Sequence, residues 1–161
     1  MNNYMLRLVL LSFMLLPLLA SAPPPVYKLK GKAVRIIDGD TFDLLVGTTT
    51  HRIRLAGIDA PEKKQDFSNA SKHLLGQLCN GQQLTVVVTD TDRNKRKIAD
   101  IYTQQKLWIN KEMIVRGMAW HFLKYSSNKE LANAELLARK QKIGLWSLAN
   151  PVAPWDWRKK I

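Results

Sequence analysis

The sequence predicts an α+β fold in which five short strands form an OB-type barrel that carries three helices. The strand-like apolar runs cover residues 32–38, 41–46, 51–58, 82–90 and 97–103. A helical pattern over residues 67–81 separates the third run from the fourth, which is where an OB barrel carries a helix. Because the strands are clustered rather than alternating with helices, a doubly wound parallel sheet is disfavoured.

Helical spacing of apolar residues predicts the three helices. The first ends at Gly81 and the second ends near Gly117, since glycine commonly terminates a helix. The third opens with Ser127 and Glu130, the spacing of a capping box, and closes at Gly144.

Cys79 is the single cysteine of the chain, so an internal disulfide is excluded. It lies four residues after Leu75, on the face of the first helix that carries apolar residues. This position predicts a buried thiol rather than a reactive one.

The first 22 residues have the layout of a secretory signal peptide. Arg7 precedes an apolar run over residues 8–19, and a small-x-small sequence ends at Ala22. The run is too short to span a bilayer comfortably, so export to the periplasm or the medium is expected, with no stable membrane span after signal removal. Pro23 beside the scissile bond leaves open where the cut falls, or whether the segment persists as an anchor.

The chain is strongly basic, with a formal net charge of +12 and a pI near 10.0. Loss of the first 22 residues would remove only Arg7 among the charged residues and leave about +11. High charge can serve solubility, but this excess also favours a polyanionic partner, and nucleic acid is the partner it favours most.

The stretch VRIIDGDTFDLL places Asp38, Gly39 and Asp40 between two strand-like runs. Asp-Gly is a strong signal for a two-residue hairpin turn, in which both central residues take a positive φ. Two carboxylates around one glycine could also hold a metal ion, and the two interpretations are compatible.

Two further stretches carry charged residues next to strands. In HRIRLAGIDAPE, Arg52 and Arg54 are expected on one face of a strand, since side chains alternate. Pro61 then stiffens the turn between Asp59 and Glu62. TDTDRNKRK places a basic loop before the last strand.

IDGDT, IRLAGIDAPE and an arginine-bearing loop before ADIY, in this order, resemble the staphylococcal (micrococcal) nuclease family, or thermonuclease family. The resemblance runs from about residue 32 to residue 146 and implies the OB barrel with three helices. The chain is then expected to divide into a signal peptide (1–22), an extended lead-in (23–31), a nuclease OB-fold domain (32–147) and a Trp-rich basic tail (148–161).

The resemblance implies a calcium ion held by Asp40, Asp59 and the backbone carbonyl of Ala60. It also implies that Asp38 and Glu62 act on the ion through water. Oxygen ligands are those that a hard cation prefers, and two carboxylates with a carbonyl leave room for water and substrate.

The resemblance further implies that Arg54 and Arg96 contact the phosphate. Guanidinium groups and a metal ion can stabilise the negative charge that develops on the phosphoryl oxygens. Glu62 is the available base, and whether it removes a proton from water or chiefly orients that water is left open.

Some assignments have alternatives. Asn94 and Lys95 stand where the family often has tyrosine and glycine, so Arg93 could replace Arg96 if the loop is shifted. Lys95 is a candidate for general contact with phosphate, and Tyr125 is a candidate substrate-binding residue.

Other residues favour structural roles. Trp155 and Trp157 could stack on bases, but docking of the tail on the barrel is favoured. The histidines lack the spacing of a zinc site; they are His51, His73 and His121.

The sequence therefore predicts an exported, calcium-dependent endonuclease that acts on DNA and RNA without selecting the sugar. The resemblance implies products with 3′-phosphate and 5′-hydroxyl ends, and a monomer is expected. The alternative is a noncatalytic OB-fold module that binds nucleic acid electrostatically.

Overall fold

The computed structural model describes residues 25–160, so the expected signal peptide lies outside the described residues. The strands are β1 (Tyr27–Ile36), β2 (Thr41–Val46), β3 (Thr49–Leu55), β4 (Ile58–Asp59), β5 (Leu84–Thr91), β6 (Lys97–Tyr102) and β7 (Trp120–His121). The helices are α1 (Ser68–Cys79), α2 (Ile109–Val115), α3 (Lys129–Lys140), the 3₁₀ turn η1 (Gly144–Ser147) and α4 (Pro154–Trp157).

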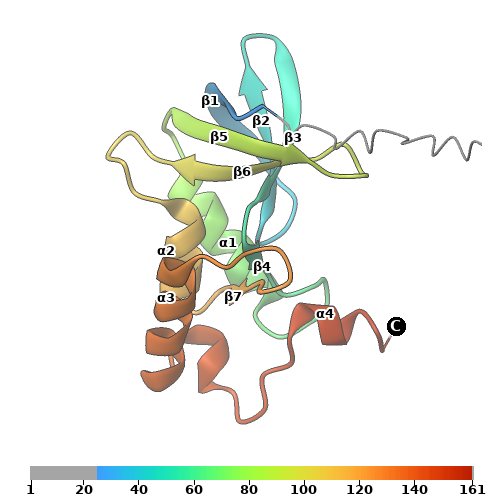
Figure 1. Ribbon diagram of the computed structural model, residues 1–161, viewed down its shortest axis with the longest axis vertical. Helices are drawn as coiled ribbons and strands as arrows, with labels where there is room; N and C mark the ends of the chain where they lie inside the picture. Colours follow the sequence, from blue (N-terminus) through green and yellow to red (C-terminus); the bar gives the residue numbers. More distant parts are fainter. Residues whose placement is uncertain (1–24, 161) are drawn as a thin grey trace, which may run out of the picture.

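Five strands form a closed barrel in the order β1-β2-β3-β6-β5, which confirms the predicted fold class (Figure 1). Neighbouring strands are antiparallel except β3 and β6, which run parallel. The helix between the two groups of strands is α1, at the predicted place in the chain. The third expected strand is shorter than predicted: β3 ends at Leu55, and Ile58–Asp59 forms a separate strand that pairs with β7.

The barrel interior follows the alternation of each strand. In β5, Leu84, Val86 and Val88 are buried, while the residues between them are half-buried. Cys79 at the end of α1 joins this core, as predicted, and burial raises the pKa of its thiol to about 12. The thiol is therefore a core group and not a nucleophile.

The segment before residue 32 belongs to the barrel and is not only a lead-in. Tyr27–Gly31 is extended, as expected, but it is the first half of β1 and pairs with Leu84–Val88 of β5. This pairing closes the barrel, because β1 also pairs with β2 through its second half.

Helices α2 and α3 lie together below the barrel in Figure 1. The side chain of Asn110 in α2 is fully buried, and its amide group donates to the backbone oxygens of Ala56 and Ala99 at 3.0 Å each. Its oxygen accepts from the amide of Ile101 at 2.9 Å. These bonds attach α2 to the end of β3, where the chain leaves the barrel.

The N-cap of α3 is Asn128, so the predicted capping box of Ser127 and Glu130 is wrong. The Asn128 side chain accepts from the amides of Glu130 and Leu131 at 2.8 and 3.2 Å. Asparagine caps a helix as well as serine does, and the helix begins one residue later than the serine pattern indicates.

The C-terminal tail is docked, as favoured for Trp155, but its partner is a second small core rather than the barrel strands. This core consists of Trp120, Ala138, Leu145, Trp146 and Ala153. The rings of Trp120 and Trp155 meet edge to face, with centroids 5.6 Å apart. The tail adds the short helix α4 to the three predicted helices (Figure 1).

The turn between β1 and β2 differs from the predicted two-residue hairpin. Neither Asp38 nor Gly39 has a positive φ, and four residues separate the strands. The turn is closed by the amide of Ile37, which donates to the backbone oxygen of Thr41 at 2.9 Å. The glycine is required for a different reason: a Cβ at Gly39 would lie 1.9 Å from Oγ of Ser71 in α1.

In the part of the chain that the structure describes, no helix has the length and apolar character needed to cross a membrane.

Gly39→Ala should lower the free energy of unfolding by about 1–3 kcal/mol, because the new methyl group overpacks the contact between the turn and α1. Gly76→Ala in α1 is the matched control, since a Cβ there meets only Ile36, at 3.7 Å. Alanine at this helical position should stabilise the protein by about 0.5–1 kcal/mol. Urea unfolding of both variants checks the pair; equal stabilities would contradict the packing argument.

Candidate active site

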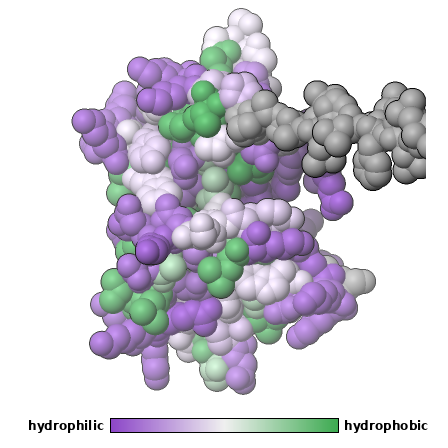
Figure 2. Space-filling view, viewed as in Figure 1, coloured by the Kyte–Doolittle hydropathy of each residue, from purple (hydrophilic) through white to green (hydrophobic). Residues whose placement is uncertain are grey.

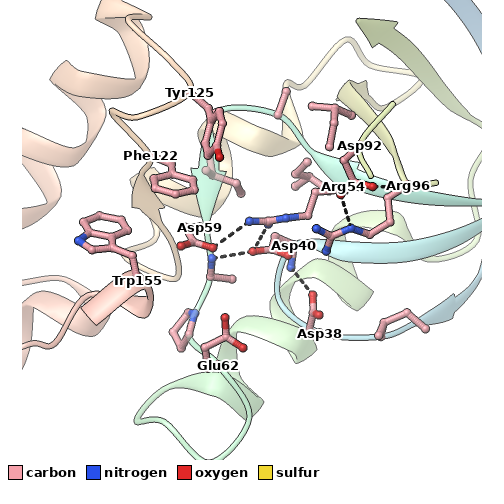
Figure 3. Close-up of a pocket in the computed structure, with 18 of the residues that line it drawn as sticks. Asp38, Asp40, Arg54, Asp59, Glu62, Asp92, Arg96, Phe122, Tyr125 and Trp155 are labelled. Atoms are coloured by element: carbon pink, nitrogen blue, oxygen red, sulfur yellow. Dashed lines mark hydrogen bonds and ion pairs between the residues drawn. The ribbon is translucent and has the colours of Figure 1, made fainter. Parts of the chain in front are cut away.

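Arg54 on β3 lies at the centre of a group of charged residues on one side of the barrel (Figure 3). Its guanidinium forms ion pairs with Asp40, from the turn before β2, and with Asp59 on β4. The Nη2 atom donates to Oδ1 of Asp59 at 2.8 Å. The side chain of Arg54 is only 12% exposed, so this group is largely removed from water.

Asp40 is oriented by one backbone amide and one side-chain hydroxyl. Its Oδ2 accepts from the amide of Ala60 at 2.7 Å, and its Oδ1 accepts from Oγ1 of Thr41 at 3.0 Å. The amide of Asp40 in turn donates to Oδ1 of Asp38 at 3.0 Å, which orders the turn. The structure thus brings Asp40 against residues 59 and 60, although twenty residues separate them in the chain.

Asp59 is placed by the pairing of β4 with β7, in which it stands opposite Trp120. It is 1% exposed. Both of its oxygens accept from guanidinium groups: Oδ1 from Arg54, and Oδ2 from Nη2 of Arg158 at 2.8 Å. No pattern in the sequence pointed to Arg158, which follows α4 and lies 99 residues away in the chain.

Burial and neighbouring charges shift the pKa values of the residues in this group. Burial raises the pKa of Asp59, and the nearby Arg158 and Arg54 offset this effect only in part. Burial also raises the pKa of Asp38, together with the charge of Asp40, to about 6. Burial alone would lower the pKa of Arg54, but the charges of Asp40 and Asp59 outweigh it and raise that pKa.

Glu62 lies in the turn stiffened by Pro61, below Asp59 in Figure 3. Its amide donates to the side-chain oxygen of Gln65 at 2.9 Å, which holds the turn. Its carboxylate forms an ion pair with Nη1 of Arg158 and is 36% exposed. Glu62 is therefore the most accessible of the candidate carboxylates that contact an arginine.

The loop between β5 and β6 holds Arg96 toward the same pocket (Figure 3). Oδ2 of Asp92 accepts from Nε of Arg96 at 2.8 Å, and Oδ1 accepts from the amides of Asn94 and Arg96 at 2.9 Å each. Lys95 has a φ of 62°, in the left-handed region that glycine adopts most easily. Arg93 and Lys95 are exposed in this loop, whereas Arg96 is half-buried.

Aromatic rings border the pocket on the side away from the barrel (Figure 3). The rings of Phe122 and Trp155 are stacked, with centroids 5.2 Å apart and planes within 2° of parallel. Tyr125 meets Phe122 edge to face at 5.0 Å and is 72% exposed. Phe122 and Tyr125 belong to the aromatic stretch GMAWHFLKYSS, and the structure places both at this pocket together with Trp155 of the tail.

One broad pocket collects all these side chains, with the most buried carboxylates in its floor. Six acidic and eight basic residues line it, so the rim is positive while Asp40 and Asp59 lie beneath. Figure 2 shows that the face in view is mainly hydrophilic, with hydrophobic residues in small separate groups. Such a rim suits an anionic polymer more than an apolar ligand.

The donor atoms in the floor suit a hard cation, although they do not form a ready cage. Among residues 25–160, no three or more His, Cys, Asp or Glu side chains are arranged to hold a metal ion. Arg54 and Arg158 instead neutralise part of the charge. Four carboxylates share this floor with the two guanidinium groups, which leaves two negative charges in excess. The carboxylates are those of Asp38, Asp40, Asp59 and Glu62. All their donors are oxygens, as Ca²⁺ and Mg²⁺ prefer.

Arginines above buried carboxylates are groups that suit the binding and hydrolysis of a phosphodiester. A model described as "Staphylococcal nuclease homologue" matches residues 52–148. An uncharacterized endonuclease of Escherichia coli O157:H7 is 39% identical over 130 residues, covering 81% of this chain and 85% of that protein. Micrococcal nuclease of Shigella flexneri is 38% identical over 140 residues, covering 81% and 80%.

The chain belongs to the staphylococcal nuclease family. It is a nuclease, a hydrolase whose substrates are nucleic acids, and the resemblance seen in three short motifs is confirmed.

Asp38→Asn should stabilise the metal-free protein at pH 7.5 by on the order of 1–2 kcal/mol. The folded state holds the proton of Asp38 more tightly than the unfolded chain, because its pKa is about 6 against an ordinary 3.8. Asp38 therefore adds to the free energy of unfolding at pH values below 3.8. This contribution is lost as the pH rises through 6.

Urea unfolding at pH 7.5 and at pH 3.5 checks this, with the exposed Asp66→Asn as control. The gain should largely vanish at pH 3.5, where Asp38 is protonated in the folded protein and mostly protonated in the unfolded chain. Destabilisation by Asp38→Asn at pH 7.5 would show that the carboxylate is a net stabilising group.

Proposed function

We propose that this nuclease is a calcium-dependent endonuclease that cleaves both DNA and RNA. The observation that carries the proposal is the buried group of Asp40, Arg54 and Asp59 in the floor of a positively rimmed pocket. The family resemblance implies calcium as the ion and 3′-phosphate and 5′-hydroxyl ends as the products.

The buried carboxylates favour catalysis over simple binding. A module that only binds nucleic acid gains nothing from negative charge beneath its phosphate site, because a carboxylate repels a phosphate. The charge has a use when a divalent cation is bound there, since the cation then attracts the phosphate. The noncatalytic alternative therefore does not explain why Asp40 and Asp59 lie beneath the phosphate site.

Asp40 and Asp59 are proposed to hold the cation directly, with the carbonyl of Ala60, and Asp38 and Glu62 through water. In the structure it is the amide of Ala60 that faces Asp40. When bound, Ca²⁺ would polarise the phosphodiester and offset the negative charge of its transition state.

Arg54 and Arg96 are proposed to bind the phosphoryl oxygens through their planar guanidinium groups. The placement of Arg96 supports it over Arg93, because Asp92 holds the Arg96 side chain at the pocket while Arg93 is exposed. Both arginines are fixed before substrate arrives, so little reorganisation is required at the moment of reaction.

Glu62 is proposed to orient a water molecule and to accept its proton. The water oxygen attacks the phosphorus atom and the bond to the 5′ oxygen breaks. The 5′ oxygen takes a proton from solvent and leaves as a hydroxyl, so the phosphate stays on the 3′ side. Glu62 suits this role because it is the most accessible of the site's arginine-bound carboxylates and stands at the pocket wall.

Action on both DNA and RNA is supported by the kind of groups in the pocket. The basic rim contacts phosphates, which both polymers share. The exposed ring of Tyr125 can stack on any base, since every base has a π-face. Export, suggested by the N-terminal 22 residues, and a monomeric state remain part of this proposal.

Purified protein should cleave plasmid DNA and total RNA with Ca²⁺ and cleave neither with EGTA. Asp40→Asn should reduce the Ca²⁺-dependent rate by about 10²-fold or more, because the variant loses a charged ligand and the transition-state stabilisation it supports. Asp66→Asn, which is exposed and lacks an ion pair among the described residues, is the matched control.

Full activity in EGTA would contradict the calcium dependence. Cleavage of DNA without RNA would contradict the lack of sugar selection. Tight binding of both polymers without cleavage would favour the noncatalytic module.

A further inference from the structure

Arg158 contacts two carboxylates of the candidate site from the far end of the chain. Its Nη2 donates to Oδ2 of Asp59 at 2.8 Å, and its Nη1 lies 3.4 Å from Oδ1 of the same residue. Nη1 also forms an ion pair with Glu62. One guanidinium therefore bridges a proposed cation ligand and the proposed base.

The tail that carries Arg158 is held by contacts of its own. Ala153 and Pro154 are buried, and Trp155 stacks on Phe122. The side chain of Gln65, from the turn that follows Glu62, donates to the backbone oxygen of Val152 at 2.6 Å. The tail is thus built against the wall of the pocket, and Arg158 is directed to the carboxylates by packed neighbours.

The contacts of Asp59 set a condition on any cation that binds there. Both carboxylate oxygens already accept from guanidinium groups, and the residue is 1% exposed. A cation that takes one of these oxygens must therefore replace an arginine contact or share its oxygen with it.

The two arginines differ in how easily they can give way. Arg54 is 12% exposed, is fixed on a barrel strand and pairs with Asp40 as well. Arg158 is 41% exposed and lies at the end of a four-residue helix. Breaking the ion pairs of Arg158 therefore costs less free energy than breaking those of Arg54, because water already screens the more exposed pair.

We propose that Arg158 is a positioning residue of the active site that holds Asp59 and Glu62 until a divalent cation replaces it on Asp59. The inference rests on the proposed function, since it concerns the same cation. In the cation-free protein the guanidinium keeps the two carboxylates ordered and limits their repulsion. The cation then competes with a bidentate contact, so Arg158 lowers the affinity for the cation.

Isothermal titration with Ca²⁺ alone tests the proposal in the full-length protein. Arg158→Gln should bind Ca²⁺ roughly three- to tenfold more tightly than the unmodified protein, because no guanidinium has to leave Asp59. Lys159→Gln removes the same charge from the adjacent residue, which lines the pocket and pairs with Asp156. Its affinity should change much less.

Arg158→Lys separates competition from simple charge. An ammonium keeps the positive charge but cannot reproduce the two-pronged contact. If competition operates, this variant should also bind Ca²⁺ more tightly than the unmodified protein. If only charge mattered, its affinity would equal that of the unmodified protein, and the proposal would be wrong.

Amide hydrogen exchange supplies a second readout. Addition of Ca²⁺ to the unmodified protein should raise the exchange of residues 153–160, because the tail loses its contact with Asp59. In Arg158→Gln these amides should exchange equally with and without Ca²⁺. Slower exchange of the unmodified tail with Ca²⁺ would overturn the proposal.

The outcomes also distinguish this inference from the proposed function. If the unmodified protein binds Ca²⁺ and requires it for cleavage, but Arg158→Gln binds no more tightly than Lys159→Gln, only the role of Arg158 is wrong. If the unmodified protein cleaves in EGTA and binds no Ca²⁺, the calcium proposal fails and this inference fails with it.

Discussion

The ion pairs that Arg54 makes with Asp40 and Asp59 are the interaction on which the site depends. Charges so far from water are costly unless they are paired and hydrogen-bonded, so removing one partner of such a group destabilises a protein by about 3–5 kcal/mol. The group is paired here because three strands deliver its members: Arg54 lies on β3, Asp40 precedes β2, and Asp59 lies on β4. The barrel therefore positions the site through charge as well as through its apolar core.

Much of the remaining structure holds those three strands in register. Gly39 lets α1 approach the turn that bears Asp40, and Asn110 fixes the end of β3 just before the chain turns toward Asp59. Strand β7 pairs with β4 and continues into Phe122, against which Trp155 brings the tail. The pocket is thus bounded by the barrel on one side and by the packed tail on the other (Figure 3).

The sequence predicted the barrel and the motifs because both depend on local pattern: strand alternation, a helix between the third and fourth strands, and acidic turns beside strands. It did not predict what depends on contacts between distant residues. Gly39 looked like a turn glycine, yet its reason is the close approach of Ser71. Asn128 caps α3 where Ser127 fitted the pattern, because several residue types can cap a helix. No sequence pattern indicated that Arg158 belongs to the site, since its partners lie almost a hundred residues earlier in the chain.

The most direct test of the account is the single-turnover rate of DNA cleavage by Arg54→Lys at saturating Ca²⁺. Lysine keeps the buried positive charge between Asp40 and Asp59 but lacks the planar fork that would bind the phosphate. Arg52→Lys is the control, because Arg52 is exposed on the same strand and pairs with Asp43. The account predicts that Arg54→Lys slows cleavage by roughly 10²–10³-fold while Arg52→Lys does not. An Arg54→Lys rate equal to that of the unmodified protein would contradict the proposed contact between the Arg54 guanidinium and the phosphate.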